Sequence, residues 1–209
     1  MRRFLLVRWA AIAATGFVTA ASAGAAPLPA FTRIDADGNE MAANGPLRPG
    51  SRPGQWACTR DNRSGLTWEI KTDDRELRDR QWSFTPYLAE WEAQGVIRGY
   101  RDRTSGRCDR TRMAEGSCNT GAYIAAVNAL KLCGHSDWRL PTVKELLAVT
   151  AHRGTEEGRR VPALPVPLPG WYWTGTIEAD GIPFQRVMLL EPGGTARLFD
   201  GTYHVWLVR

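Results

Sequence analysis

The 209-residue chain lacks the short motifs by which common enzyme and metal-binding classes are recognised. It contains no Gly-x-Ser-x-Gly nucleophile elbow, no phosphate-binding loop, no His-Glu-x-x-His and no Cys-x-x-Cys. Its three histidines, His135, His152 and His204, share no ligand spacing, and we expect each on the surface or in a loop. We therefore predict no catalytic residue, no metal site and no cofactor. A glycosidase stays open, because its two carboxylates need only be close in space.

Lysine is scarce, since only Lys71, Lys131 and Lys144 contribute to the 27 basic residues. The arginines that make up the remainder carry a planar fork of donors that suits carboxylates and sulfates. With 22 acidic residues the formal net charge is +5, but three arginines lie within residues 1–23, and without that segment the balance is 24 − 22 = +2. So small a net charge argues against nucleic acid as a partner.

The N-terminal apolar run, residues 9–21, is shorter than the roughly 20 residues that a membrane helix needs. It follows a basic stretch and ends in Ala21-Ser22-Ala23, a small-x-small pattern typical of signal-peptidase cleavage. We predict a signal peptide over residues 1–23, a flexible segment over 24–30 and one exported domain over 31–209. That domain would be periplasmic or at the cell surface, with no membrane span after cleavage; an uncleaved N-terminal anchor is the alternative.

Cysteine is limited to four residues, and none follows Cys133. An even number in an exported protein predicts two disulfides, for which three pairings exist. We favour Cys108–Cys118, because these two residues bracket a loop rich in Gly and Arg, which leaves Cys58–Cys133 to tie a strand to a helix end. In the chain-entropy model the short loop contributes about 2–3 kcal/mol and the long one about 4 kcal/mol. A zinc site is the rival interpretation.

Hydrophobic patterning predicts an α+β domain. In the N-terminal half we expect a strand over 31–34 and a hairpin over 56–71 with its turn at 61–65. Leu66, Trp68 and Ile70 alternate, so they should share one buried face of the second hairpin strand. Residues 35–39 predict a turn, residues 41–55 a Gly- and Pro-rich loop, and residues 72–118 a long polar, turn-rich region.

Two helices and several strands are expected in the C-terminal half. A helix should begin at Asn119 or Thr120 and reach about Leu132, followed by Gly134 as its C-terminal glycine. Its apolar face would hold Tyr123, Ile124, Val127 and Leu130. A Thr142–Glu145 capping box after Pro141 predicts a second helix that runs to about His152 and carries Leu146, Leu147 and Val149. Strands are expected over 171–176, 185–190, 195–199 and 203–208.

Residues 133–146, Cys-Gly-His-Ser-Asp-Trp-Arg-Leu-Pro-Thr-Val-Lys-Glu-Leu, carry a family resemblance. Further segments share it: Trp56-x-Cys58-x-x-Asp61-x-x-Ser64-Gly65-Leu66-x-Trp68-Glu69, Tyr123-x-Ala-Ala-Val-Asn128, Tyr172-Trp173-Thr174 and Leu207-Val-Arg209. From Phe31 onward the sequence resembles the C-terminal domain of the Legionella collagen-like adhesin, the Lcl C-terminal domain family. The resemblance implies a C-type-lectin-like fold, with two helices on short antiparallel strands in a loop-rich, disulfide-stapled domain. It also implies an adhesin-like role in binding sulfated glycosaminoglycans.

The motif that carries the resemblance is also interpretable as a set of fold determinants. Trp138, Leu140, Trp171 and Trp173 should be buried, because tryptophan is on average a highly buried residue. Arg139 is expected to join its strand to a carboxylate in the core. Pro141, Thr142 and Glu145 start the next helix.

Two site chemistries known for this fold class are missing from the sequence. Arg-Leu-Pro-Thr also occurs in formylglycine-generating enzymes, but the cysteine pair near the C-terminus that those enzymes look to is absent. Calcium-dependent lectins look for Glu-Pro-Asn, whereas Glu191-Pro192 is followed here by two glycines. Residues 35–40 offer several oxygens, but Gly38 comes too early for an EF-hand loop, and a plain turn is predicted.

A cluster of arginines is the predicted binding site. It consists of Arg98, Arg101, Arg103, Arg107, Arg110 and Arg112, with Tyr100 available to stack on a sugar face. The Cys108–Cys118 bridge would make part of this segment rigid, which lowers the ordering cost of binding. We predict a non-catalytic module that binds acidic or sulfated polysaccharide. The alternative for this segment is a solvated loop whose arginines pair with local acids. The alternative for the protein is a structural or assembly subunit of the envelope that binds a protein partner through an exposed apolar patch.

Overall fold

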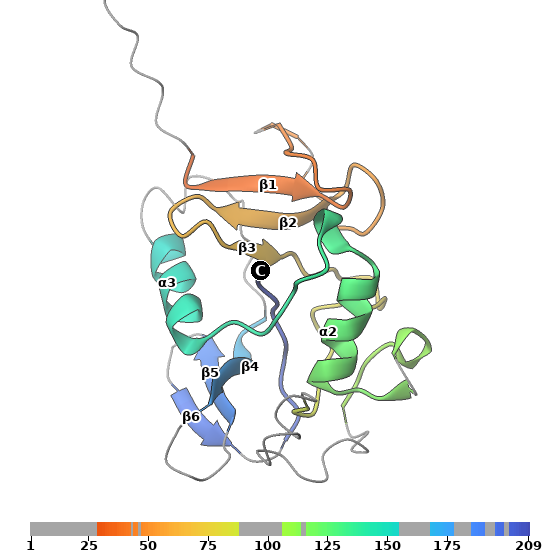
Figure 1. The fold of residues 1–209 in the computed structure, drawn as a ribbon, viewed down its shortest axis with the longest axis vertical. Helices are drawn as coiled ribbons and strands as arrows, with labels where there is room; N and C mark the ends of the chain where they lie inside the picture. The colour runs from red at the N-terminus through yellow and green to blue at the C-terminus, as the bar shows by residue number, and fades with distance from the viewer. Residues whose placement is uncertain are drawn as a thin grey trace, which may run out of the picture.

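The computed structural model describes residues 29–42, 44–45, 47–87, 106–113, 116–154, 168–177, 185–190, 195–198 and 201–209. Two three-stranded antiparallel sheets and two α-helices give an α+β fold, as the sequence predicts. In Figure 1 the first sheet lies at the top, with α3 and α2 on either side below it, and the second sheet lies at the lower left. None of the helices in the described ranges has the length and apolar character needed to cross a bilayer.

The first sheet consists of β1 (Phe31–Asp35), β2 (Trp56–Asp61) and β3 (Thr67–Glu69), in that order. The predicted hairpin between β2 and β3 is present, and Asp61 builds its turn by accepting hydrogen bonds from Arg63 N and Ser64 Oγ at 2.9 Å. Trp68 and Ile70 are buried on one face and Leu66 packs against the same cluster, which confirms the predicted alternation. The opposite face is also buried, because Glu69 is inaccessible to solvent.

Helix α2 (Thr120–Ala129) begins where the sequence predicts but ends early. The Asn119 side chain accepts a hydrogen bond from Ala122 N at 2.8 Å and so caps the helix. The expectation that α2 reaches Leu132 is wrong: Leu130 is 49% exposed, and Leu132–Gly134 forms a separate 3-10 turn, η3. The chain leaves the helix because Cys133 is bonded to Cys58 of β2 and its N–H donates to Ala36 O.

Helix α3 (Val143–Gly154) has the predicted capping box. Glu145 N donates to Thr142 Oγ1 at 3.2 Å, and Thr142 N donates to Glu145 Oε2 at 2.7 Å. The expected core partner of Arg139 is wrong, because its guanidinium group makes a two-pronged, half-exposed ion pair with Glu145 at 2.7 and 2.9 Å. Leu146 and Val149 are buried as expected, but Leu147 faces solvent.

The histidine prediction fails at His152, which is 3% exposed. Its Nδ1 lies 2.9 Å from Asp61 Oδ1, and its ring lies 4.6 Å from the ring of Phe31. The cause is tertiary: the last turn of α3 packs on the edge of the first sheet, far away in sequence. His152 therefore fastens α3 to the β2–β3 turn.

The second sheet consists of β4 (Gly170–Ile177), β5 (Gln185–Leu190) and β6 (Thr195–Leu198), close to the predicted strands. Residues 203–208 were expected to form a further strand, but they run through the middle of the molecule and make only isolated bridges, to Phe84, Tyr172, Arg139 and Trp68. The chain end lies between the two sheets (Figure 1).

The central terminal segment separates two hydrophobic clusters. Val205 and Leu207 point into the larger cluster, which also holds Trp138, Leu140 and Trp173. Trp206 and Val208 point into the other, beside Trp68. Because successive side chains of this extended segment point to opposite sides, the segment contributes to both clusters. The burial of Trp138, Leu140 and Trp173 confirms their prediction as core residues, whereas Trp171 is only partly buried.

Candidate functional site

The described part of the arginine cluster lies on the disulfide loop, residues 108–118, and on the adjacent residue Arg107. Cys108 and Cys118 are bonded, as are Cys58 and Cys133, so both predicted bridges are present. The loop is docked by backbone pairing of Arg107 with Ser83, at 2.8 and 2.9 Å, and by Thr85 N, which donates to Cys118 O. Within it, η1 (Arg110–Arg112) is capped by the Asp109 side chain. The bridge and these contacts tie both ends of the loop to neighbouring segments.

Three of the predicted arginines are described and exposed: Arg107 just before the loop, and Arg110 and Arg112 on it. Arg110 donates to Gly116 O at 2.8 Å, and Arg112 lies 3.3 Å from an Asp109 oxygen and 3.7 Å from a Glu76 oxygen. Two of the three guanidinium groups therefore contribute to the loop's own structure. The other members of the predicted cluster lie outside the described residues: Arg98, Tyr100, Arg101 and Arg103.

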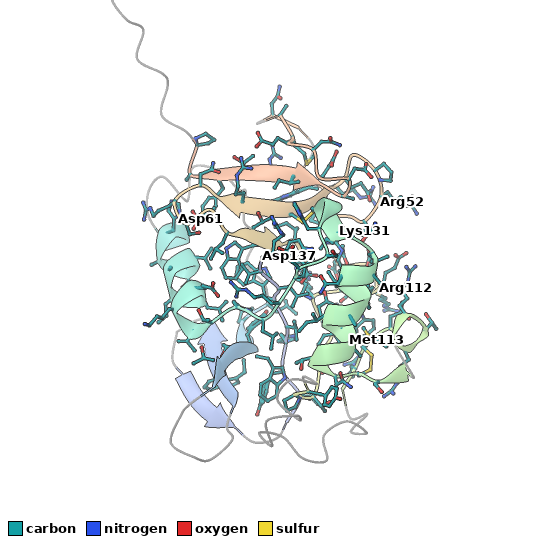
Figure 2. All side chains as sticks on the ribbon, in the orientation of Figure 1. Arg52, Asp61, Arg112, Met113, Lys131 and Asp137 are labelled. Atoms are coloured by element: carbon teal, nitrogen blue, oxygen red, sulfur yellow. A yellow bond between two sulfur atoms is a disulfide. The ribbon has the colours of Figure 1, made fainter. Side chains whose placement is uncertain are left out.

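An open pocket with a volume of about 490 Å³ adjoins the disulfide loop, and the two meet where Arg112 approaches Glu76. One wall is the loop over residues 48–55, the other is the loop over residues 71–80, and Trp206 also lines the space. Figure 2 shows Arg52 and Arg112 along one side of the molecule and Asp61 on the other. The charged lining residues are Arg48, Arg52, Lys71, Asp73, Asp74, Glu76 and Arg80.

The two walls differ in how their charges are satisfied. On the 71–80 wall, Asp73 pairs with Arg80 at 2.6 Å, and Asp74 accepts from the Thr72 hydroxyl at 2.8 Å. On the 48–55 wall, the guanidinium groups of Arg48 and Arg52 are exposed and have no hydrogen-bond or ion-pair partner within the described part of the chain. The pocket therefore offers two guanidinium groups to an anionic ligand on one wall and carboxylates with partners of their own on the other.

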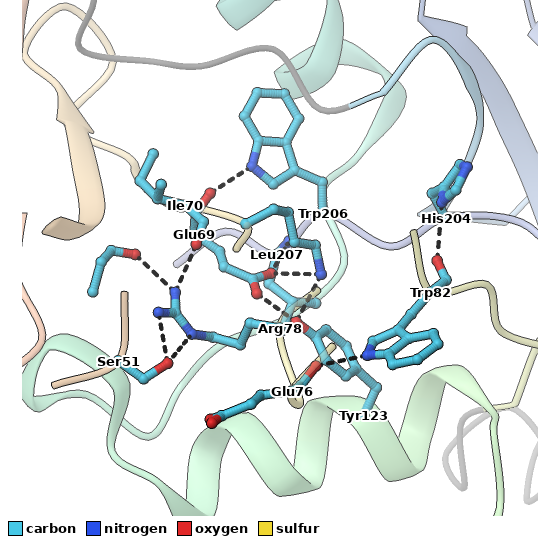
Figure 3. Close-up of polar contacts among 12 residues, drawn as sticks. Ser51, Glu69, Ile70, Glu76, Arg78, Trp82, Tyr123, His204, Trp206 and Leu207 are labelled. Carbon is cyan, nitrogen blue, oxygen red and sulfur yellow. Dashed lines mark hydrogen bonds and ion pairs between the residues drawn. The ribbon is translucent and has the colours of Figure 1, made fainter. Parts of the chain in front are cut away.

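A buried polar network lies beneath the pocket (Figure 3). The Tyr123 hydroxyl donates a short hydrogen bond to the inaccessible Glu69 carboxylate and accepts one from Lys71 Nζ at 2.7 Å. Lys71 Nζ also lies 3.3 Å from Glu69 Oε2 and 4.2 Å from the centre of the Tyr123 ring. Burial lowers the pKa of Lys71 while the Glu69 carboxylate opposes that change, and burial together with Glu69 raises the pKa of Tyr123.

Arg78 holds the backbone of the 48–55 wall in place. Its buried guanidinium group donates to Gly50 O and Ile70 O at 2.6 Å and to Ser51 Oγ at 2.9 Å (Figure 3). These bonds join the 48–55 loop to the strand end that carries Lys71. The backbone between Arg48 and Arg52 is thus held against the rest of the pocket.

The pocket was not predicted, because no pattern in the sequence shows that residues 48–52 and 71–80 are close in space. The first segment reads only as a Gly- and Pro-rich loop, and Lys71 only as the end of a strand. The predicted turn at Asp35 is confirmed, because its Oδ1 accepts from Asp37 N and Asn39 N at 3.0 and 2.9 Å. In the described ranges no group of three or more His, Cys, Asp or Glu side chains is placed to hold a metal ion.

Comparison with known proteins identifies the family. A family model described as the Lcl C-terminal domain matches residues 57–209, which is more than half of the chain. No curated protein and no solved structure gave a significant match. The matched region includes both disulfides, both helices and all residues of the Trp138–Glu145 motif. The chain therefore belongs to the Lcl C-terminal domain family.

Proposed function

We propose that this protein is an exported, non-catalytic binding module of C-type-lectin-like type that recognises acidic or sulfated polysaccharide in an adhesin-like role. The observation that carries the proposal is that Arg52 on the 48–55 loop and Arg112 on the 108–118 loop lie exposed on the same side of the molecule (Figure 2), on loops held by Arg78 and by the Cys108–Cys118 bridge. Guanidinium groups bind sulfate and carboxylate through paired donors. Membership of the Lcl C-terminal domain family supports the adhesin-like role.

The distribution of apolar side chains favours this function over an assembly subunit. Five tryptophans are buried in the two clusters: Trp56, Trp68, Trp138, Trp173 and Trp206. Among the described residues the exposed large hydrophobic side chains are Leu47, Leu130 and Leu147, which lie on a loop, after α2 and on α3. They belong to separate elements, whereas a protein-docking surface gathers its apolar side chains into one patch. Exposed arginines beside an open pocket suit an acidic polysaccharide better than they suit an apolar protein surface.

Retention on heparin-type resin tests the proposal. The mature protein should bind at low ionic strength and elute with modest added NaCl, because exposed charges are screened over about 8 Å at physiological salt. Replacing Arg48, Arg52 and Arg107 together with Ser should abolish retention and leave the thermal midpoint nearly unchanged, since all three are exposed and surface arginines contribute little stability.

A matched control removes the same amount of charge elsewhere. Arg60, Arg63 and Lys144 lie near the β2–β3 turn and on α3, on the side of the molecule marked by Asp61 in Figure 2. Their triple Ser variant should elute at nearly the parent's salt concentration. Equal elution of the triple arginine variant and the parent would remove these arginines from the site. Failure of the parent to bind at all would refute the function and favour the envelope subunit with a protein partner.

A further inference from the structure

The pocket between residues 48–55 and 71–80 has one wall that is cationic and one that is mostly anionic. Arg48 and Arg52 stand on the first wall, and Asp73, Asp74 and Glu76 on the second. Lys71, whose side chain is 8% exposed, is a largely buried charge that still lines the space. This division of charge restricts the ligands that fit.

The cationic wall selects an anionic group. The carboxylates opposite already have partners, since Asp73 is paired with Arg80, Asp74 with the Thr72 hydroxyl, and Glu76 more distantly with Arg112. Within the described residues the guanidinium groups of Arg48 and Arg52 have none. Each can offer two parallel N–H donors to a carboxylate or a sulfate.

The anionic wall selects hydroxyl groups. An ionised carboxylate has about four acceptor positions and no donor, so Asp73 and Asp74 can each accept further hydrogen bonds beyond those they make in the protein. A ligand with only an anionic group would leave this wall unused and would be repelled by it. A ligand with several hydroxyls around one anionic group satisfies both walls.

We propose that this pocket binds one anionic sugar unit, a uronate or a sulfated hexose. Its anionic group lies against Arg48 and Arg52, and its hydroxyls donate to the carboxylates of the 71–80 wall. The volume of about 490 Å³ lies within the range of roughly 300–1,000 Å³ that is typical of small-ligand sites. The inference rests on the proposed function and deepens it, because it gives the polysaccharide a defined unit-binding site beside the disulfide loop.

The network below makes the pocket rigid before a ligand arrives. Arg78 ties Gly50 and Ser51 to Ile70, the residue that follows β3, and Glu69 and Tyr123 hold Lys71 in place. A preformed site loses less conformational entropy on binding than a mobile one does. We therefore expect the pocket to bind a single sugar unit weakly but specifically.

The test is an NMR titration of the full mature protein with four probes. These are a glucuronate–N-acetylglucosamine disaccharide, its 6-sulfated form, the neutral disaccharide lactose, and inorganic sulfate. Shifts should appear at the Trp206 indole and at the amides of residues 50–52 and 73–76 with one or both anionic disaccharides, and not with lactose. Whichever disaccharide binds more tightly identifies the anionic group as carboxylate or sulfate. Inorganic sulfate should bind at least ten-fold more weakly.

Three variants complete the design. Arg48→Ser with Arg52→Ser should weaken the bound disaccharide at least ten-fold, whereas Arg60→Ser with Arg63→Ser removes equal charge and should leave its affinity within two-fold. Asp73→Asn should weaken the disaccharide and not inorganic sulfate. Equal binding of sulfate and disaccharide, or unchanged binding to the Arg48/Arg52 variant, overturns the inference.

The resin experiment separates this failure from that of the proposed function. A protein that is retained on heparin-type resin but shows no disaccharide shifts has the polysaccharide function without this pocket. A protein that shows pocket shifts but no retention has the sugar site and lacks the polymer function. Absence of both refutes both.

Discussion

Tyr123→Phe is the substitution that best tests the buried network under the pocket. The change removes one oxygen atom, which donates to Glu69 and accepts from Lys71. The ring itself is kept, along with its packing on Phe84 at 4.7 Å and its contact with the Lys71 ammonium group. Any loss of stability therefore reports on the hydroxyl group alone.

The expected loss follows from the charge and burial of Glu69. Its Oε1 loses the Tyr123 donor, whereas Oε2 keeps Lys71 and the Leu207 N–H, both at 3.3 Å. A hydrogen bond to a charged group contributes about 1.5–3 kcal/mol, and an inaccessible carboxylate cannot recruit bulk water in its place. We expect a loss of about 2–3 kcal/mol in the free energy of unfolding.

Urea denaturation measures this loss, and Tyr172→Phe is its control. Tyr172 is equally buried, but its hydroxyl makes a 2.7 Å hydrogen bond to a neutral acceptor, Leu168 O, so its loss should be about 1 kcal/mol. For a slope of roughly 2 kcal/mol/M, the urea midpoint should fall by about 1–1.5 M for Tyr123→Phe and by about 0.5 M for Tyr172→Phe. Equal shifts for the two variants would show that Glu69 does not depend on the Tyr123 hydroxyl.

Three further outcomes are expected. Thr142→Ala should lower the free energy of unfolding by about 1 kcal/mol, seen as a lower urea midpoint at unchanged slope, because α3 loses its cap. The Arg139 hydrogen bonds lower the pKa of Glu145 below 4.5, so its stabilisation is present above that pH and is lost as the pH falls through the folded-state pKa. The stability gap between wild type and Glu145→Gln should accordingly shrink between pH 7 and acid pH; a constant gap contradicts the ion pair. Replacing Cys108 and Cys118 together with Ser should cost about 2–3 kcal/mol in thermal unfolding, and non-reducing peptide mapping of the parent should find these two joined.

Features fixed by neighbouring residues are the ones that sequence reasoning predicted. The Asn119 cap, the Thr142–Glu145 capping box and the Asp61 turn each depend on side chains within three residues of the backbone they bond. The Cys108–Cys118 pairing depends on a short loop. In each case the partners are close in sequence, so the pattern contains the contact.

Other features that depend on distant partners were missed or wrong, although the Cys58–Cys133 bridge was predicted by elimination once Cys108–Cys118 was favoured. The end of α2 is set by the bond from Cys133 to Cys58, 75 residues away. His152 is buried by Asp61, 91 residues away, and no local signal marks it. The pocket combines two loops and Trp206, so its arginines become a site only when the chain has folded.

The path of the terminal segment has a consequence for the order in which the chain can fold. Trp206 and Leu207 bond to Glu69 across 137 and 138 residues, and residues 205–208 alternate between the two clusters. Neither hydrophobic cluster is therefore complete until residues 205–208 have packed between the two sheets. Until then, the apolar side chains that residues 205–208 cover in both clusters stay exposed. Contacts between residues so far apart in sequence also form slowly. Folding of this domain can therefore be completed only after its last core residue, Val208, has been synthesised.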